Sequence, residues 1–293
     1  EKFIYLNIFT GLLFFIPLFL FLYKTNTFFL GLIVSIPIAI YLVHIGYIKQ
    51  SISLAFVLLL FLSLQKEKIL DSFIFFIASY CFHSSSIIFI IPIFLSFIIK
   101  SIEKKTNQIN IKKLIFILYS LLLFCILIII IILKTGIINV FDLLFLPEKM
   151  QFMIYIYLID NKQYGEVIRS NGIYFRILPY SAAIIISLFL LSREKLFLNF
   201  NSFCFFVFLF FLCIFLAAIG SSSIADRLQF YSLPFQIWML NSSNNLFINN
   251  KNKIIFDILV ILLFLFILLI WLMHSNYSSI NWQPYQLNSI LFN

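Results

Sequence analysis

Charged side chains are scarce in this 293-residue chain, and their scarcity excludes most classes of protein. Only 11% of the residues are charged, against about 25% in an average soluble domain. Hydrophobic residues make up 63% of the chain, Phe accounts for 40 positions, and the mean hydropathy is +1.11. A soluble fold has too little interior to hide so much apolar surface, so the surrounding solvent must be lipid. A cytosolic enzyme, a secreted disulfide scaffold and a disordered chain are all excluded.

Cysteine and histidine are also few, and neither is arranged for metal binding. The four cysteines fall within apolar runs, at Cys81, Cys125, Cys204 and Cys213. A free thiol packs there as a small hydrophobic group, and no Cys or His pair has the spacing of a metal site. The net charge of +9 is explained by membrane topology, because no basic stripe marks a soluble face. We therefore expect no metal, no cofactor and no nucleic-acid partner.

Long apolar runs predict an all-α, polytopic membrane protein of about ten transmembrane helices, forming a single domain over residues 1–293. The runs cover 3–22, 27–45, 51–64, 69–82, 85–99, 114–133, 173–191, 203–219, 227–240 and 254–273. Crossing ~30 Å of hydrocarbon takes ~20 residues, whereas the third, fourth, fifth and ninth runs have at most 15. The polar ends of these short helices are expected to lie below the membrane surface.

The distribution of lysine predicts the orientation of the bundle. Residues 100–113 (KSIEKKTNQINIKK) contain five lysines, which places this connection in the cytoplasm. The 39-residue connection 134–172 then lies outside, and its apolar stretches suit short interfacial helices. These either cover an outward-facing cavity or form a lipid-facing collar. The chain opens without an initiator Met or a signal-peptide pattern, so we expect a further helix to precede it.

Ionisable residues near membrane depth are functional candidates by default, and two of them are brought together by a hairpin. The third and fourth helices lie between Lys49 and His83 and return them to the same, outer side. Lys49, followed by Gln50, either binds an anion or extends to the interface as an anchoring lysine. His83, followed by Ser84, either caps a tight turn or takes part in catalysis or substrate binding.

Three of the four arginines fall on the outer side, at Arg169, Arg176 and Arg227. The guanidinium fork binds phosphate in a way that lysine does not. Arg227 is expected to begin the ninth helix, where free N–H groups and the helix dipole favour anions, with Tyr231 one turn further on. Asp226 and Gln229 match a capping box at the same point. Arg176 either binds the anion or anchors the seventh helix.

Together these residues predict a recessed, cationic, outward-facing pocket containing one histidine. The headgroup of a lipid-linked phosphate or pyrophosphate lies at that depth and would suit it. At these residues the chain resembles the EpsG family of exopolysaccharide and O-antigen (Wzy-type) polymerases.

The resemblance is carried by four motifs in order along roughly the whole chain. KQSISLA at 49–55 is similar to an Arg-Gln-x-x-Ala-like motif, with Lys49 in place of the usual Arg. FHSSSIIF at 82–89 is similar to a Phe-His-x-Ser motif. The two remaining motifs are Arg-x-x-x-Tyr at Arg227 and Tyr231, and Trp-x-Pro-Tyr at Trp282, Pro284 and Tyr285.

The resemblance implies polymerisation of polyprenyl-pyrophosphate-linked sugar repeat units at the outer face of the bacterial cytoplasmic membrane. Arg227, Arg176 and Lys49 would then bind the pyrophosphate. His83 would activate the acceptor or orient the donor, and the other substrate-binding residues would be Gln50, Ser84 and Tyr231. No metal is required where three cations neutralise the leaving group. A chain-length regulator and a flippase are the expected partners, besides membrane lipid.

Two other functions remain open at this stage. A membrane O-acyltransferase that decorates sugars would also have about ten helices and an essential histidine. It would take its acyl donor from the cytoplasm, where the sequence shows no ionisable cluster apart from the loop lysines. A lipid-linked oligosaccharide transporter would show paired Gly- or Pro-broken helices and repeat symmetry, which seven Gly and seven Pro do not display.

Overall fold

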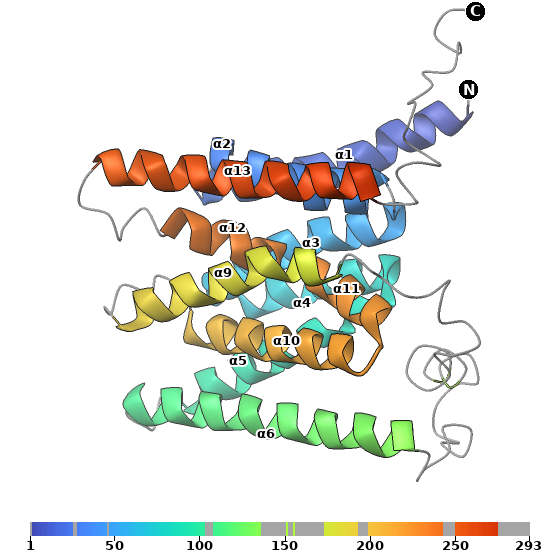
Figure 1. Cartoon of the computed structure of the whole chain (residues 1–293). Helices are drawn as coiled ribbons and strands as arrows, with labels where there is room; N and C mark the ends of the chain where they lie inside the picture. Colours follow the sequence, from blue (N-terminus) through green and yellow to red (C-terminus); the bar gives the residue numbers. More distant parts are fainter. Residues whose placement is uncertain are drawn as a thin grey trace, which may run out of the picture.

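A computed structural model describes most of the chain as a bundle of helices (Figure 1). The described residues are 2–25, 28–45, 47–102, 108–135, 151, 155, 173–192, 199–242 and 250–274, and none of them lies in a strand. In chain order the helices are α1 (Lys2–Lys24), α2 (Phe28–Ser35), the π-helix η1 (Ile36–Ile45), α3 (Ile48–Gln65), α4 (Ile69–Phe82), the 3₁₀ helix η2 (Ser84–Phe89), α5 (Ile90–Ile102), α6 (Gln108–Thr135), α9 (Ile173–Ser192), α10 (Phe200–Ala218), α11 (Ser222–Phe230), α12 (Leu233–Ser242) and α13 (Asn250–His274).

The expected all-α, polytopic membrane architecture is confirmed. Within the described residues, six helical segments are long and apolar enough to cross a bilayer. They are 7–24, 48–65, 84–102, 111–135, 200–218 and 251–270. Three shorter apolar helices, at 28–40, 69–82 and 177–191, pack among them.

Two helices form the centre of the bundle and two lie at its edges. In the spans of α3 and α10, 67% of the residues are buried, compared with 17% in α6 and α13. Figure 1 shows α6 and α13 at opposite outer edges with α3 and α10 between them. Large apolar side chains such as Phe124 and Phe266 are exposed on these outer helices. An exposed apolar face of this size is what a lipid-facing helix requires.

Four of the predicted helices differ in length or continuity. The third is longer than expected, because α3 has 18 residues, whereas α4 has the expected 14 residues. The second run divides into α2 and η1, and the fifth begins as η2 before α5. The ninth run is two helices, α11 and α12, separated by a turn at Tyr231 and Ser232. Apolar composition continues through these breaks, so hydropathy alone does not reveal them.

The hairpin of α3 and α4 reverses at residues 66–68 and brings the two helices alongside each other. Glu67 adopts a left-handed conformation, with φ of 56°, at the tightest point of the reversal. Further along the pair, the buried hydroxyls of Ser53 and Ser79 are hydrogen-bonded at 2.7 Å. The start of α3 and the end of α4 therefore lie at the same end of the bundle.

Candidate functional site

The predicted site residues Gln50 and Arg227 are in direct contact. Gln50 lies in the first turn of α3, is 2% exposed, and donates a hydrogen bond from Nε2 to the main-chain oxygen of Arg227 at 2.9 Å. Arg227 lies in the last turn of α11, where main-chain carbonyls have no N–H partner within the helix. The amide of Gln50 thereby caps the end of α11 and holds Arg227 at the start of α3.

His83 occupies the junction between α4 and η2. Its backbone is extended, with φ of −152° and ψ of 120°, and its carbonyl accepts from the hydroxyl of Ser86 at 2.9 Å. The N–H of Ser85 points to Nδ1 at 3.4 Å, so Nδ1 is the unprotonated nitrogen and the neutral ring carries its proton on Nε2. His83 thus caps η2 and at the same time keeps an N–H group on the other side of the ring.

A chain of hydroxyl groups joins His83 to the interior of the bundle. Nδ1 lies 2.5 Å from Oγ of Ser85 and 3.5 Å from the hydroxyl of Tyr231. Oγ of Ser85 lies 3.1 Å from the Tyr231 hydroxyl, and that hydroxyl lies 2.9 Å from Oγ of Ser53. Tyr231 is fully buried and packs edge-on against Phe89. Residues from α3, α4, η2 and the α11–α12 turn therefore form one connected polar cluster, consisting of Ser53, Ser79, His83, Ser85 and Tyr231.

The electrostatic environment keeps His83 neutral. Burial, together with the positive charge of Arg227, lowers the pKa of its imidazole to about 4. Because the ordinary value is near 6.5, the ring is unprotonated at neutral pH. A base with so low a pKa accepts protons weakly, whereas its Nε2–H remains a competent hydrogen-bond donor.

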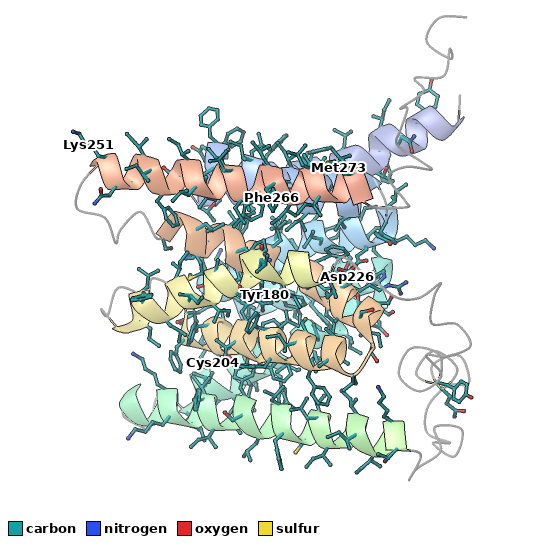
Figure 2. The ribbon with its side chains drawn as sticks, in the orientation of Figure 1. Tyr180, Cys204, Asp226, Lys251, Phe266 and Met273 are labelled. Carbon is teal, nitrogen blue, oxygen red and sulfur yellow. The ribbon has the colours of Figure 1, made fainter. Side chains whose placement is uncertain are left out.

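The expected position of Arg227 at a helix start is wrong. The helix begins at Ser222, with Ser221 in the capping position, so Arg227 lies in its last turn. Asp226 and Gln229 accordingly lie inside α11 and do not form a capping box. Figure 2 shows Asp226 at the end of the bundle opposite to Lys251. Any anion at Arg227 is bound by its side chain and not by the amino end of α11, and the helix dipole at this end favours the cation itself.

The other predicted residues are placed less closely. Lys49 is exposed in the first turn of α3, beside Gln50, and Ser84 is exposed next to His83; both stay predictions. Arg176 lies in the first turn of α9, which packs against α11, but its side chain is outside the described residues. Arg169, most of the connection 134–172 and the Trp-x-Pro-Tyr motif are also outside them.

Sequence reasoning missed three members of the cluster. Ser53, Ser79 and Ser85 are small, and serine is common in apolar helices because it can bond to its own backbone. A signal was nevertheless present, since Ser53 lies one helical turn after Lys49 and Ser79 lies one turn before His83. That register places both hydroxyls on the faces that carry the predicted site residues.

The cluster has no arrangement for metal chemistry. Within the described residues, no group of three His, Cys, Asp or Glu side chains is close enough to hold a metal ion. The cluster contains a neutral imidazole and a chain of hydroxyls, and the charge of the nearby Arg227 acts on that imidazole. Such a set can donate hydrogen bonds to an anion and shift a proton between neighbouring oxygens, which is the chemistry of group transfer with an anionic leaving group.

The fold and this cluster define a multi-pass membrane protein with a polar, cationic site at one end of its helical bundle. The chain matches the EpsG family across residues 1–287 and belongs to that family, which is associated with Wzy-type polymerases. Membership places it among membrane proteins of polysaccharide biosynthesis. Searches of curated proteins and of solved structures returned no match.

Proposed function

We propose that this protein polymerises polyprenyl-pyrophosphate-linked oligosaccharide repeat units of an O-antigen, capsule or exopolysaccharide. The reaction takes place at the outer face of the bacterial cytoplasmic membrane. One observation carries the proposal: motif residues from distant parts of an EpsG-family chain, Gln50, His83, Arg227 and Tyr231, meet at one end of the bundle.

The chemistry is a glycosyl transfer between two lipid-linked units. A hydroxyl oxygen of the acceptor sugar forms a bond to the anomeric carbon of the donor, and the bond from that carbon to the pyrophosphate oxygen breaks. The electron pair of the broken bond leaves with polyprenyl pyrophosphate, and the proton of the acceptor hydroxyl is released. Charge therefore builds up on the leaving pyrophosphate, where cations and hydrogen-bond donors stabilise it most.

The described residues suit these requirements. The guanidinium of Arg227 matches pyrophosphate oxygens through two parallel N–H donors, with Lys49 and Arg176 as further cations. His83 donates a hydrogen bond from Nε2–H to the lipid-linked donor sugar, since its Nδ1 faces Ser85 and Tyr231. This favours donor orientation over acceptor activation among the two roles expected for His83. A flippase would supply the substrate and a chain-length regulator would act on the product.

The test is a product assay on membranes containing the protein and lipid-linked repeat units extracted from its host. We expect a ladder of polymer that disappears in Arg227→Ala. An acetylated repeat unit without a ladder would identify an acyltransferase instead. Movement of the unit across the bilayer without chemical change would identify a transporter.

A matched control separates loss of activity from loss of folding. His44 is a second partly buried histidine, whose Nδ1 lies 3.1 Å from Oγ of Ser51 and whose ring stacks on Phe14. His44→Gln removes an imidazole from a comparable environment outside the polar cluster. It should leave the ladder intact at equal protein level, whereas equal losses from His44 and His83 variants would argue against a specific site.

A further inference from the structure

A second polar cavity lies at the opposite end of the bundle. Its volume is about 610 Å³, and it is enclosed by the ends of α1, α3 and α5 and the beginnings of α4, α6 and α10. α3 runs from Gln50 at the site described above to Gln65 at this cavity. The 18 residues of α3 separate the two by roughly 25 Å. The cavity is therefore independent of the polar cluster at His83.

Lysines from four different helix ends line this cavity. They are Lys24, Lys66, Lys100 and Lys112. Among the described residues of the lining the one carboxylate is Glu67, so positive charge dominates there. Within the described part of the chain, the ion pair at this end joins Lys68 to Asp71, and neither belongs to the lining. The four ammonium groups are left available to an anion that enters the cavity.

An unsatisfied hydrogen-bond donor adds an independent indication of a ligand. Oε1 of Gln65 accepts from the N–H of Asn199 at 2.8 Å, which fixes the orientation of the amide. Nε2 of the same amide is buried and has no partner among the residues that the structure describes. A neighbouring amide, that of Asn201, is by contrast fully engaged, with Tyr119, Pro92 and Ser96. Buried donors in proteins almost always have partners, so an acceptor oxygen in the cavity would complete Gln65 once a small side-chain movement exposes Nε2.

The cavity continues onto an apolar surface. A smaller hollow of about 300 Å³ shares Lys112 and Phe200 with it and extends along α6 past Phe116 and Ile117. These two side chains are 58% and 52% exposed, on the helix that faces lipid. Lys112 also lies 5.9 Å from the centre of the Phe200 ring. A ligand that fits both hollows has an anionic head and an acyl chain.

We infer that this cavity binds the phosphate headgroup of an anionic glycerophospholipid, with one acyl chain along the face of α6. The lysine-rich connection 100–113 orients the cavity toward the cytoplasm, and basic pockets between transmembrane helices on that side suit anionic headgroups. The inference requires only the bundle and its orientation, and it holds whether or not the chain is a polymerase.

Trp238 lines the cavity and provides a direct readout. In a variant whose other two tryptophans are replaced (Trp271→Phe, Trp282→Phe), phosphatidylglycerol with brominated acyl chains should quench Trp238 fluorescence when present as a minor component in phosphatidylcholine vesicles. Brominated phosphatidylcholine in a phosphatidylglycerol host should quench far less. Equal quenching by both lipids would overturn the inference, because it would mean unselective contact with bulk lipid.

Paired substitutions test the headgroup contacts. Lys66→Gln with Lys100→Gln should weaken binding of phosphatidylglycerol, measured by native mass spectrometry, at least tenfold. Lys251→Gln with Lys253→Gln removes the same charge from α13, outside the cavity, and should change it less than twofold. Gln65→Leu keeps every charge and should still weaken binding severalfold. Equal effects of the two lysine pairs, or binding of glycerol 3-phosphate without any of phosphatidylglycerol, would overturn the lipid assignment.

Discussion

The side-chain amide of Gln50 caps the last turn of α11 by donating to the main-chain oxygen of Arg227, 177 positions further along the chain. This bond connects the first predicted motif to the third. Because it is made to the backbone, it positions Arg227 without occupying its guanidinium. The place of this cation in the site is therefore set by a residue of a different helix.

Gln50→Leu should impair catalysis through the position of Arg227. The substitution keeps a similar volume but leaves a carbonyl without its donor, which costs about 1–3 kcal/mol. Gln50→Glu also loses the donor and adds a negative charge near a helix end that already repels anions. We expect both variants to lower kcat/KM for polymerisation by roughly tenfold or more, with Glu the worse. Full activity in Gln50→Glu would show that the contact has no catalytic consequence.

Arg227→Lys should lose nearly as much activity as Arg227→Ala. Lysine keeps the charge but not the planar pair of donors that matches pyrophosphate. Loss of such a charged hydrogen-bond pair costs about 2–5 kcal/mol. Both variants leave the main-chain oxygen in place for Gln50, so helix position is preserved. Polymer yield at equal protein level is the measurement, and near wild-type yield from the lysine variant would rule out bidentate recognition.

Two substitutions at His83 separate its roles. Asn places an acceptor near the position of Nδ1 and retains the cap on η2, whereas Gln places an N–H near the position of Nε2. If the Nε2–H orients the donor, His83→Gln should keep substantial activity and His83→Asn should keep very little. The reverse order would assign His83 to the turn alone. Inactivity of both, with normal expression and insertion, would instead indicate proton acceptance by the ring.

The pH profile follows from the lowered pKa of His83. The folded protein holds this pKa at about 4, so the neutral ring persists well below the ordinary value near 6.5. Polymerisation that requires neutral His83 should therefore continue undiminished through pH 6.5 and decline only toward pH 4. The unfolded chain takes up this proton first, so stability should fall as the pH drops from 6.5 toward 4. An activity loss centred on pH 6.5 would contradict the assignment of a neutral ring.

Accessibility labelling tests the orientation of the bundle. In a background without native cysteines, a membrane-impermeant thiol reagent applied outside the cell should modify a cysteine at Lys162 and spare one at Lys105. This expectation rests on the lysine-rich connection 100–113, because basic loops are retained in the cytoplasm. Opposite labelling would place the polar cluster at His83 on the cytoplasmic side.

The sequence predicts the helices of this protein better than their ends. Each of the ten apolar runs overlaps at least one helix among the described residues. The bounds of α4, 69 and 82, are the predicted ones. The sequence predicts one helix for the ninth segment, because Leu228, Phe230 and Leu233 continue its apolar character across the turn at Tyr231. Hydropathy reports affinity for lipid and contains little information about where backbone hydrogen bonds change partners.

For the candidate site, too, the sequence predicts some residues and not others. His83, Arg227, Gln50 and Tyr231 were predictable from residue types that are costly in a membrane and from their order along the chain. The serines that connect them were not, because a hydroxyl in an apolar helix is inexpensive and gives no distinct signal. Ser53 becomes recognisable only when α3 and α4 lie side by side, since its main partners, Ser79 and Tyr231, are 26 and 178 positions away.

The hairpin of α3 and α4 has a consequence for biogenesis. With 14 residues, α4 reaches only ~21 Å, which is short of the ~30 Å of hydrocarbon. α3 presents Gln50, Ser51, Ser53 and Ser63 on buried faces. α3 is nevertheless long and apolar enough to cross the bilayer, whereas α4 alone is too short to do so. The bond between Ser53 and Ser79 masks one hydroxyl of each helix, so we expect α4 to enter the bilayer together with α3.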